Sequence, residues 1–336
     1  MSELRRDHLA GRWVLIAGER GSRPNEYARA GPRSRVSPYS DRCPFCPGNE
    51  ASTPPAVLEL PDRSDAARWQ VRAFANKYAA LTPEAPPADS DHGRFFASLP
   101  GEGVHEVLVE SPVHDRSPSS MTEDETTCVV RAHALRYAAL MAGPATEYVL
   151  VFKNHGEEAG TSLRHPHSQI IATPFVPDDV RNKGSIAETH YRQTGECLLC
   201  RTVEEEVRCG ARVVHSDEQY VVFHPFASSR FAETWIVPRD HRPSFGRASP
   251  GNLARLGRVL SRTMKQLSVA FGDPDFNYIL HSCPRAYEDA AQACWHWYLQ
   301  IVPRVAKAAG VELGTGIHIN TGWPEETAEA MRRIRP

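Results

Sequence analysis

The sequence lacks three features that would assign it to a well-defined class of protein. None of its apolar runs approaches the roughly 20 residues that a membrane helix needs. The first seven residues have no apolar core of the kind that a signal peptide carries. The formal net charge is -2, which implies no strong binding to a polyanion. We therefore expect a cytoplasmic protein that binds neither nucleic acid nor a membrane.

The sequence is not short of cysteine. Its 336 residues, enough for one large domain or two moderate ones, include eight cysteines, and four of these form two C-x-x-C pairs. In a reducing compartment such pairs are more often metal or redox sites than disulfides. The pairs are Cys43/Cys46 and Cys197/Cys200, and the other four cysteines are interpreted as ordinary thiols: Cys128, Cys209, Cys283 and Cys294.

The most informative stretch is Arg-His-Pro-His-Ser-Gln-Ile-Ile at residues 164–171, which follows an apolar run and a glycine-spaced loop. We predict a short strand here. Side chains alternate between the two faces of a strand, so His165, His167 and Gln169 are expected to point the same way. Two imidazoles and an amide on one face, after a loop rich in backbone N–H donors, predict a phosphate-binding site.

The two halves of the sequence repeat one ordered pattern. Each half has a C-x-x-C pair, strands, one ending in histidine, a helix, and a strand that begins with histidine. His114 corresponds to His241, and His165 corresponds to His296. Two cysteines and two histidines are a typical ligand set for a structural zinc ion, which is tetrahedral and has no open position for water. We predict two such sites, with these ligands: Cys43, Cys46, His114 and His165 in the first half, and Cys197, Cys200, His241 and His296 in the second.

A difference between the halves indicates the reactive residue. The first half reads His165-x-His167-x-Gln169, whereas the second reads His296-x-Tyr298-x-Gln300. His167 thus has no counterpart in the second half. A neutral imidazole attacks phosphorus without first losing a proton, so we predict that His167 is a nucleophile. Gln169 can donate to a phosphate oxygen but cannot act as an acid or a base, which favours transfer over hydrolysis.

These motifs resemble those of the galactose-1-phosphate uridylyltransferases, a branch of the histidine-triad superfamily. The resemblance rests on Cys43-Pro-Phe-Cys46, Ser111-Pro-Val-His114 and His165-Pro-His167-Ser-Gln169, and it covers nearly the whole chain. It implies an α+β fold of two histidine-triad-like halves, each an antiparallel sheet with a helix, fused into one core. We place the catalytic half at residues 1–180 and the half without a nucleophile at residues 190–336.

The resemblance also implies roles for individual residues. His167 would carry the uridylyl group between UDP-glucose and a hexose 1-phosphate, as in galactose metabolism by the Leloir pathway. A homodimer is implied, in which arginines from a neighbouring subunit reach the phosphates. The remaining contacts implied are these: Asn154, Ser162 and Gln169 to the nucleotide phosphates, Asn76 and Lys77 near the ribose, Arg20 and Arg23 to phosphates, and Glu312 to sugar hydroxyls.

Some features depart from the best-known bacterial members. Those members carry His-x-His in the second half, where they bind iron without a C-x-x-C pair, whereas this chain has Tyr298 and the Cys197/Cys200 pair. The chain is therefore more similar to a two-zinc branch, some members of which resemble nucleotide-sugar phosphorylases that use adenine nucleotides. Ser162-Leu163-Arg164 also replaces the usual Ser-Asn-Pro.

Three hypotheses follow. The first is a ping-pong hexose-1-phosphate uridylyltransferase, and the second is an ADP-sugar phosphorylase or adenylyltransferase that uses the same histidine. The third is a zinc-stabilised nucleotide-binding module without turnover, against which the intact His167 argues. A hydrolase is the weakest enzymatic alternative, because position 169 is glutamine.

Overall fold

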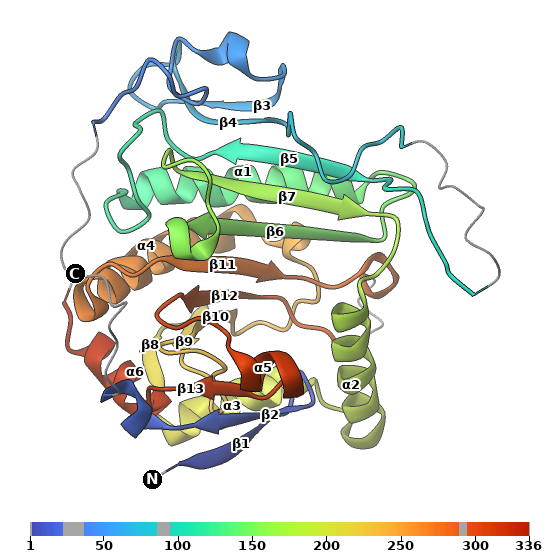
Figure 1. Ribbon diagram of the computed structural model, residues 1–336, viewed down its shortest axis with the longest axis vertical. Coiled ribbons are helices and arrows are strands. Elements are labelled where there is room, and N and C mark those ends of the chain that lie inside the picture. Colours follow the sequence, from blue (N-terminus) through green and yellow to red (C-terminus); the bar gives the residue numbers. More distant parts are fainter. Residues whose placement is uncertain (1, 23–36, 86–94, 289–293, 336) are drawn as a thin grey trace.

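The computed structural model describes residues 2–22, 37–85, 95–288 and 294–335, which form an α+β structure built on two sheets (Figure 1). The larger sheet has ten strands, and all neighbouring strands in it are antiparallel. In spatial order its strands are β3 (Ala56–Pro61), β4 (Trp69–Ala75), β5 (Val104–Val109), β7 (His167–Thr173), β6 (Tyr148–His155), β11 (Phe276–His281), β12 (Tyr298–Pro303), β10 (Thr234–Pro238), β9 (Tyr220–Phe223) and β8 (Val213–Ser216).

The smaller sheet joins the beginning of the chain to its end. In it β2 (Arg12–Ile16) pairs antiparallel with β1 (Glu3–Asp7) and parallel with β13 (His318–Asn320). It lies beside the second half of the large sheet, together with the short helix α5 (Gly310–Thr315), as Figure 1 shows. The other helices are α1 (Glu123–Met141), α2 (Asp178–Thr194), α3 (Leu198–Cys209), α4 (Pro250–Phe271) and α6 (Pro324–Arg332).

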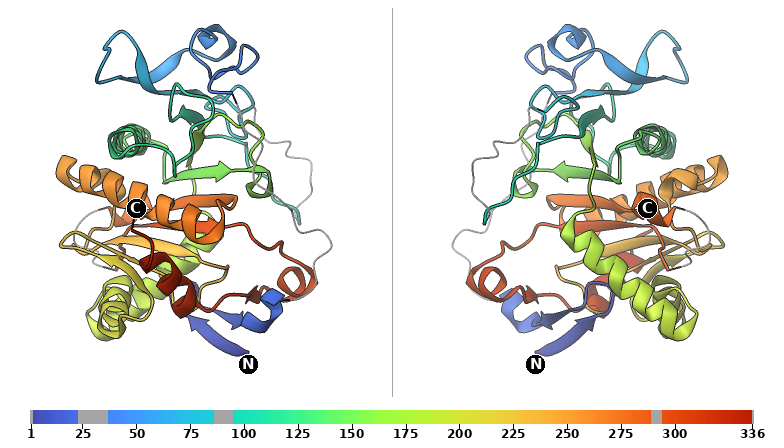
Figure 2. Two further views of the ribbon diagram at one scale, coloured as in Figure 1. Left: turned by 90° about the vertical axis from the view of Figure 1, so that its left-hand side faces the viewer. Right: turned by 90° about the vertical axis from the view of Figure 1, so that its right-hand side faces the viewer.

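Helices α1 and α4 cover one face of the large sheet side by side (Figure 2). Thr122 caps α1: its hydroxyl accepts from the Glu125 N–H while the Glu125 carboxylate accepts from the Thr122 N–H. The two helices approach closely at Gly257, where an added Cβ would lie 2.3 Å from the Thr127 hydroxyl. Any larger residue at position 257 would push the helices apart.

Alternate residues of the central strands point to these helices and form the main core. Val151, Ile170, Leu280 and Ile301 are at most 3% exposed and belong to the same apolar cluster as the buried stripes of both helices. Burying such side chains contributes about 1.5–3 kcal/mol each. The residues between them in sequence point to the opposite face of the sheet, and this alternation decides where the polar side chains of the site can lie.

The strand order reads the same from either edge of the large sheet. Strands β3-β4-β5-β7-β6 of the first half are followed by their counterparts in reverse, β11-β12-β10-β9-β8. The central pair, β6 and β11, is antiparallel, and Phe152 lies opposite Ile279 in it. Counting outward from this pair matches Gln169 with Gln300 and His167 with Tyr298. The α+β fold of two antiparallel halves in one core is confirmed.

One local prediction differs from the structure. The strand expected over residues 164–171 begins only at His167, because residues 162–165 form no regular structure and Pro166 has no N–H to give to a ladder. The polar stretch 176–196 that follows β7 is mostly the single helix α2. Among the described residues, no helix is long and apolar enough to cross a membrane.

Candidate functional site

His167 is the first residue of β7 and lies between β5 and β6 in the sheet. The neighbouring Ser168 points toward α1, where its hydroxyl lies 2.7 Å from His133 Nε2. Because adjacent residues of a strand face opposite ways, His167 and Gln169 point to the face that α1 and α4 leave uncovered. The His167 side chain is buried in a single chain and packs edge-on against Phe45, with ring centroids 5.4 Å apart.

One hydrogen bond fixes the tautomer of His167. Its Nδ1 lies 2.8 Å from the carbonyl oxygen of His165, and a carbonyl only accepts, so Nδ1 must carry the proton. The lone pair of Nε2 is then unprotonated. Burial lowers the pKa of His167 and so favours the neutral ring. A neutral imidazole with its lone pair on Nε2 is chemically competent to attack an electrophile.

Gln169 belongs to a hydrogen-bonded group that includes a histidine missed by the sequence analysis. Ala80 N–H donates to His105 Nδ1 at 3.0 Å, so the His105 proton is on Nε2, which donates to Gln169 Oε1 at 2.8 Å. Asn76 Nδ2 lies 3.2 Å from the same His105 nitrogen. The amide N–H groups of Gln169 thus remain available to a ligand. No local sequence pattern links His105 to Gln169, because the two residues meet only through the pairing of β5 with β7.

The predicted phosphate loop follows β6. The side-chain oxygen of Asn154 accepts a hydrogen bond of 2.8 Å from Asn277, which also bonds the loop carbonyl of Ala159 at 2.9 Å. Gly160 has a φ of +84°, a conformation that favours glycine and turns the chain back toward the strand. The side chain of Ser162 is exposed after this turn. Asn154 thus lies near the end of β6 and Ser162 in the loop between β6 and β7, and the Asn154 oxygen is already engaged by Asn277.

The remaining predicted contact residues lie elsewhere in the chain. Lys77 is exposed just after β4. Arg20 is exposed in a turn after β2, and Glu312 lies in α5, where its carboxylate accepts from the Ala309 N–H at 3.0 Å. Elements β2 and α5 lie beside the second half, away from β7, so one chain does not bring these two residues to His167 (Figure 1). Arg23 lies outside the described residues.

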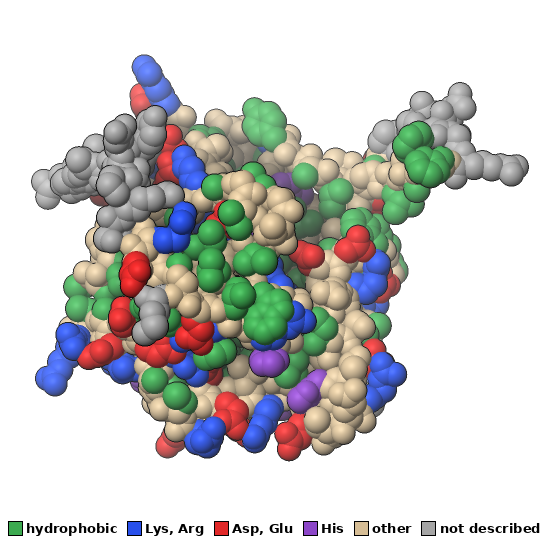
Figure 3. Space-filling model, turned by 60° about the horizontal axis from the view of Figure 1, so that its bottom comes forward, with side chains coloured by type: hydrophobic (Ala, Val, Ile, Leu, Met, Phe, Trp, Pro, Cys, Tyr) green, Lys and Arg blue, Asp and Glu red, His purple; other side chains and the backbone are tan. Residues whose placement is uncertain are grey.

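Figure 3 looks onto this end of the molecule, where basic and acidic side chains are mixed with apolar ones. The exposed apolar residues of α5 include Leu313, which is 80% exposed, and Val311, which is 49% exposed. Isolated apolar side chains are common on protein surfaces, but two on one short helix beside predicted contact residues are notable. An exposed apolar surface of this kind is available for contact with another subunit.

The first predicted ligand set is brought together from three segments of the first half. Its two sulfur and two Nδ1 atoms all lie within 4.8 Å of one another. Individual separations are 3.6 Å from His165 Nδ1 to each sulfur and 3.3 Å from His165 Nδ1 to His114 Nδ1. The edges of a tetrahedral zinc site are about 3.3–3.8 Å long, given bonds of about 2.0–2.3 Å. These four atoms could therefore hold a metal ion.

The second ligand set converges in the same way but is less enclosed. Cys200 Sγ lies 3.3 Å from Nδ1 of His241 and 3.3 Å from Nδ1 of His296. His241 is exposed, whereas all four residues of the first set are buried or half-buried. His165 Nε2 lies 2.7 Å from the Ser111 carbonyl, but His296 Nε2 is buried with no hydrogen-bond partner in the described part of the chain. The first set thus has an orienting contact that the second lacks.

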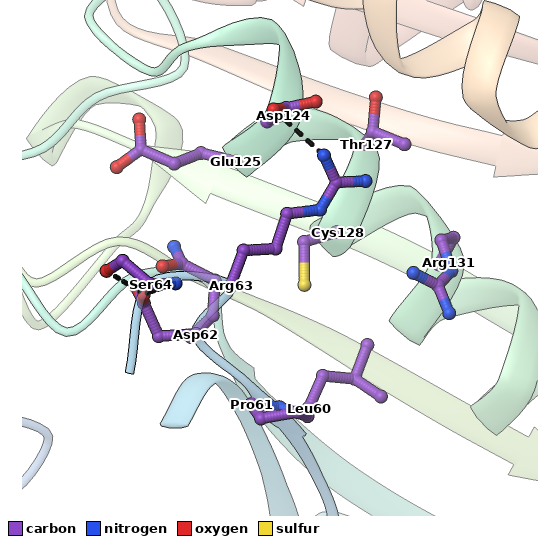
Figure 4. Close-up of a pocket in the computed structure, with 11 residues that line it drawn as sticks. Leu60, Pro61, Asp62, Arg63, Ser64, Asp124, Glu125, Thr127, Cys128 and Arg131 are labelled. Carbon is purple, nitrogen blue, oxygen red and sulfur yellow. Dashed lines mark hydrogen bonds and ion pairs between the residues drawn. The ribbon is translucent and has the colours of Figure 1, made fainter. Parts of the chain in front are cut away.

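A pocket of about 370 Å³ lies between the end of β3 and the first turns of α1 (Figure 4). Arg63 points across it to Asp124, with an ion-pair distance of 2.9 Å, and Cys128 and Arg131 line the helix side. Both members of the ion pair are 71% exposed. None of the predicted site residues lines this pocket, so it is separate from the site around His167.

Comparison with known proteins agrees with the motifs. Residues 1–177 match the family described as galactose-1-phosphate uridyl transferase, N-terminal domain. A protein named ADP-glucose phosphorylase from Arabidopsis thaliana is 31% identical over 99% of this chain and 93% of its own length. A protein named galactose-1-phosphate uridylyltransferase from Thermotoga maritima is 27% identical over 99% of this chain and 98% of its own length.

Solved structures show the same relationship. An ADP-glucose phosphorylase from Arabidopsis thaliana, with bound ADP-glucose, aligns with a TM-score of 0.84 at 30% identity and covers 100% of both chains. A structure titled as a uridylyltransferase aligns with a TM-score of 0.75 at 28% identity, over 99% of this chain and 97% of the other. Both similarities include the two halves of the large sheet.

Proposed function

This chain belongs to the galactose-1-phosphate uridylyltransferase family, and on that basis we propose that it transfers a nucleotidyl group through a covalent His167 intermediate. The chain is an enzyme of the nucleotidyltransferase class. The observation that carries the mechanism is the Nδ1 contact of 2.8 Å to the His165 carbonyl, which leaves Nε2 unprotonated. His167 is thereby prepared for attack on the α-phosphorus of a nucleotide sugar.

The reaction has two balanced steps. In the first, a bond forms between Nε2 and the α-phosphorus while the bond from that phosphorus to the bridging oxygen breaks, and the sugar 1-phosphate leaves. In the second, a phosphate oxygen of the acceptor attacks the same phosphorus and the bond to Nε2 breaks. The N–H groups of Gln169 would donate to phosphate oxygens, so much of the catalysis comes from positioning and charge stabilisation.

The donor we favour is ADP-glucose, with inorganic phosphate as acceptor and ADP and glucose 1-phosphate as products. The support is the higher identity, 31% against 27%, and the higher TM-score, 0.84 against 0.75, of the adenine-nucleotide relative. UDP-glucose with a hexose 1-phosphate, the first expectation from the sequence, stays a prediction. It is the second candidate, because several relatives that span most of this chain carry the uridylyltransferase name.

We further propose that both cysteine and histidine clusters bind zinc. Two thiolates and two imidazole nitrogens form the ligand set that zinc prefers, and the separations of 3.3–3.6 Å fit its tetrahedron. Zinc would have no open position in either cluster and would act by holding the chain. In the first half it would hold His165, whose carbonyl in turn orients His167.

A homodimer completes the proposal. Arg20, Arg23 and Glu312 would serve the site of a neighbouring subunit, since Arg20 and Glu312 lie on elements remote from His167 in one chain. The exposed Val311 and Leu313 on α5 would be covered in that contact. A cytoplasmic location remains our prediction, and the absence of disulfides among the eight described cysteines fits a reducing compartment.

Initial-rate kinetics with a panel of donors and acceptors tests this function. We expect turnover of ADP-glucose with inorganic phosphate and parallel double-reciprocal lines, as a covalent intermediate requires. Turnover of UDP-glucose with galactose 1-phosphate instead would keep the mechanism and change the donor. Nucleotide binding without turnover of either pair would favour the binding module, and release of free mononucleotide in water would favour a hydrolase.

A further inference from the structure

We infer that the second half of the chain holds the nucleophile of the first half in position through a buried network: Tyr278, Glu110 and Lys153. This inference rests on the proposed role of His167. The network lies on the α1 face of the sheet, behind the strand that carries His167, and does not touch the substrate side. Its three members are positioning residues.

Hydrogen bonds connect the second half to the backbone of His167. The Tyr278 hydroxyl, on β11 of the second half, donates to Glu110 Oε1 at 2.9 Å. The other oxygen of Glu110 accepts from Lys153 Nζ at 2.5 Å, and Nζ also donates to the His167 carbonyl at 3.0 Å. All three side chains are at most 3% exposed. Of the four residues, Tyr278 belongs to the second half. Three hydrogen bonds therefore connect its hydroxyl to the backbone carbonyl of His167.

The network acts on the turn that orients His167. Three consecutive carbonyl groups in this turn each accept a hydrogen bond: His165 from His167 Nδ1, Pro166 from the Glu110 N–H, and His167 from Lys153 Nζ. Two of these three donors, the Glu110 backbone N–H and Lys153 Nζ, come from residues of the network. A shift of the turn would lengthen the bond to Nδ1, which fixes both the tautomer and the direction of Nε2.

The cost of burial indicates a specific role. A lysine and a glutamate with almost no exposure lose most of their hydration, and a buried pair of this kind is often no more stabilising than apolar residues of the same size. A purely structural element at this position could be built from apolar side chains. Apolar side chains could not donate to the His167 carbonyl, and Lys153 does so across the strand pair.

The corresponding place in the second half has no such pair. By the symmetry of the sheet, Leu280 occupies the position of Lys153, and it is an apolar core residue. Tyr298, the counterpart of His167, needs no orientation for chemistry. The charged network is thus found behind the strand with a nucleophile and not behind its counterpart, within the part of the chain that the structure describes.

The first test compares Tyr278→Phe with a matched control, Tyr137→Phe. Tyr137 is also fully buried and also links the halves, since its hydroxyl donates to Ser282 at 2.8 Å, but it does not reach His167. We expect similar small losses of melting temperature in both variants. We expect kcat to fall about 10-fold in Tyr278→Phe with KM nearly unchanged, and to stay within about twofold in Tyr137→Phe. Equal kcat in the two variants would overturn the inference.

A second measurement does not depend on turnover. The Nδ1 proton of His167 should give a downfield signal in nitrogen-15 histidine spectra, assigned by its loss in His167→Gln. We expect its exchange with water to be faster in Tyr278→Phe than in wild type or Tyr137→Phe, and faster again in the double variant Lys153→Met with Glu110→Gln. Unchanged exchange would contradict positioning. Faster exchange in a protein without turnover would retain the network and reject the proposed function.

Discussion

The two halves of this chain share a strand order and a metal-ligand pattern, yet the same position carries a nucleophile in one and a core residue in the other. His167 faces the uncovered side of the sheet, with an unprotonated Nε2. Its counterpart Tyr298 is packed between Trp235 and His281, with ring centroids 4.6 Å and 4.4 Å away. Burial raises the pKa of Tyr298 well above its usual value, so this phenol stays neutral.

The glutamines at the matched positions show the same divergence. Gln169 accepts from His105 and keeps its N–H groups available. Gln300 instead donates to Glu233 at 2.7 Å and accepts from His281 at 2.7 Å, so it is tied on both sides. Glu233 also accepts from Trp235 and from Ser229. The Gln300 side chain is thus held at both its oxygen and its nitrogen by neighbouring side chains, whereas the Gln169 nitrogen has no such partner among the described residues.

The largest expected effect comes from removing the nucleophile. His167→Gly should lower turnover by at least about 10³-fold and abolish the covalent nucleotide, because it removes the nucleophile that we propose. Tyr298→His should not create a second labelled site, since its ring would remain enclosed by Trp235 and His281. Labelling of two residues in Tyr298→His would show that the side chain at position 298 alone, and not its enclosure, makes the second half unreactive.

The next effect distinguishes the two cysteine and histidine clusters, which we propose to bind zinc. His165 Nε2 has the Ser111 carbonyl as a partner, and such orienting contacts are worth about 10- to 100-fold in metal affinity. A chelator should therefore remove metal from the exposed second cluster first, in two phases of one equivalent each. Cys43→Ser should eliminate the slow phase and Cys200→Ser the fast one. Release in a single phase would contradict the difference in enclosure.

Acid should destabilise both halves through buried histidines. Burial lowers the pKa of His133 to about 4 and that of His224 to about 3, so each is neutral in the folded chain near pH 6. The unfolded chain binds these protons below about pH 6.5, so stability is highest above that pH and falls as the pH drops toward 4 and 3. Each histidine should contribute a slope of up to about 1.4 kcal/mol per pH unit.

Denaturant titrations between pH 7 and pH 5 measure this slope. His133→Asn and His224→Asn should each reduce it by a similar amount if the halves unfold together as one core. A reduction by only one of the two substitutions would indicate that the halves unfold separately.

The smallest effect concerns the hydrogen bonds of the two glutamines. His105→Ala should lower kcat/KM about 10-fold, because Gln169 loses the donor that orients it. Glu233→Gln, at the matched position of the second half, should leave kcat/KM within about twofold of the wild type. Equal losses in the two variants, with unchanged melting temperatures, would mean that the second half also contacts the substrate.

The fold and the ligand clusters followed from patterns that are local or repeated. The two C-x-x-C pairs and the alternating polar side chains around His167 each predict a structure from residues close in sequence. The repeat then paired each cysteine motif with its distant histidines. The structure brings these eight cysteines and histidines together in the same two groups of four, each of which could hold a metal ion.

Other features depend on contacts that no local pattern reveals. Lys153 lies inside β6 and Glu110 directly follows β5, and only the order β5-β7-β6 in the sheet shows that the two charges are buried together. His105 could be linked to Gln169 only once β5 was known to neighbour β7. Arg20 and Glu312 were assigned by resemblance, and their place in one chain is remote from His167.

The most direct test of the central claim is to locate the covalent nucleotide. The protein is incubated with ADP-glucose, and separately with UDP-glucose, without acceptor, and is then analysed by intact mass and by peptide mapping at a pH that preserves phosphoramidates. The account predicts one nucleotidyl group per chain, on His167, and none in His167→Gly. A nucleotide on a residue of the second half, or none with either donor in an enzyme that turns over, would contradict it.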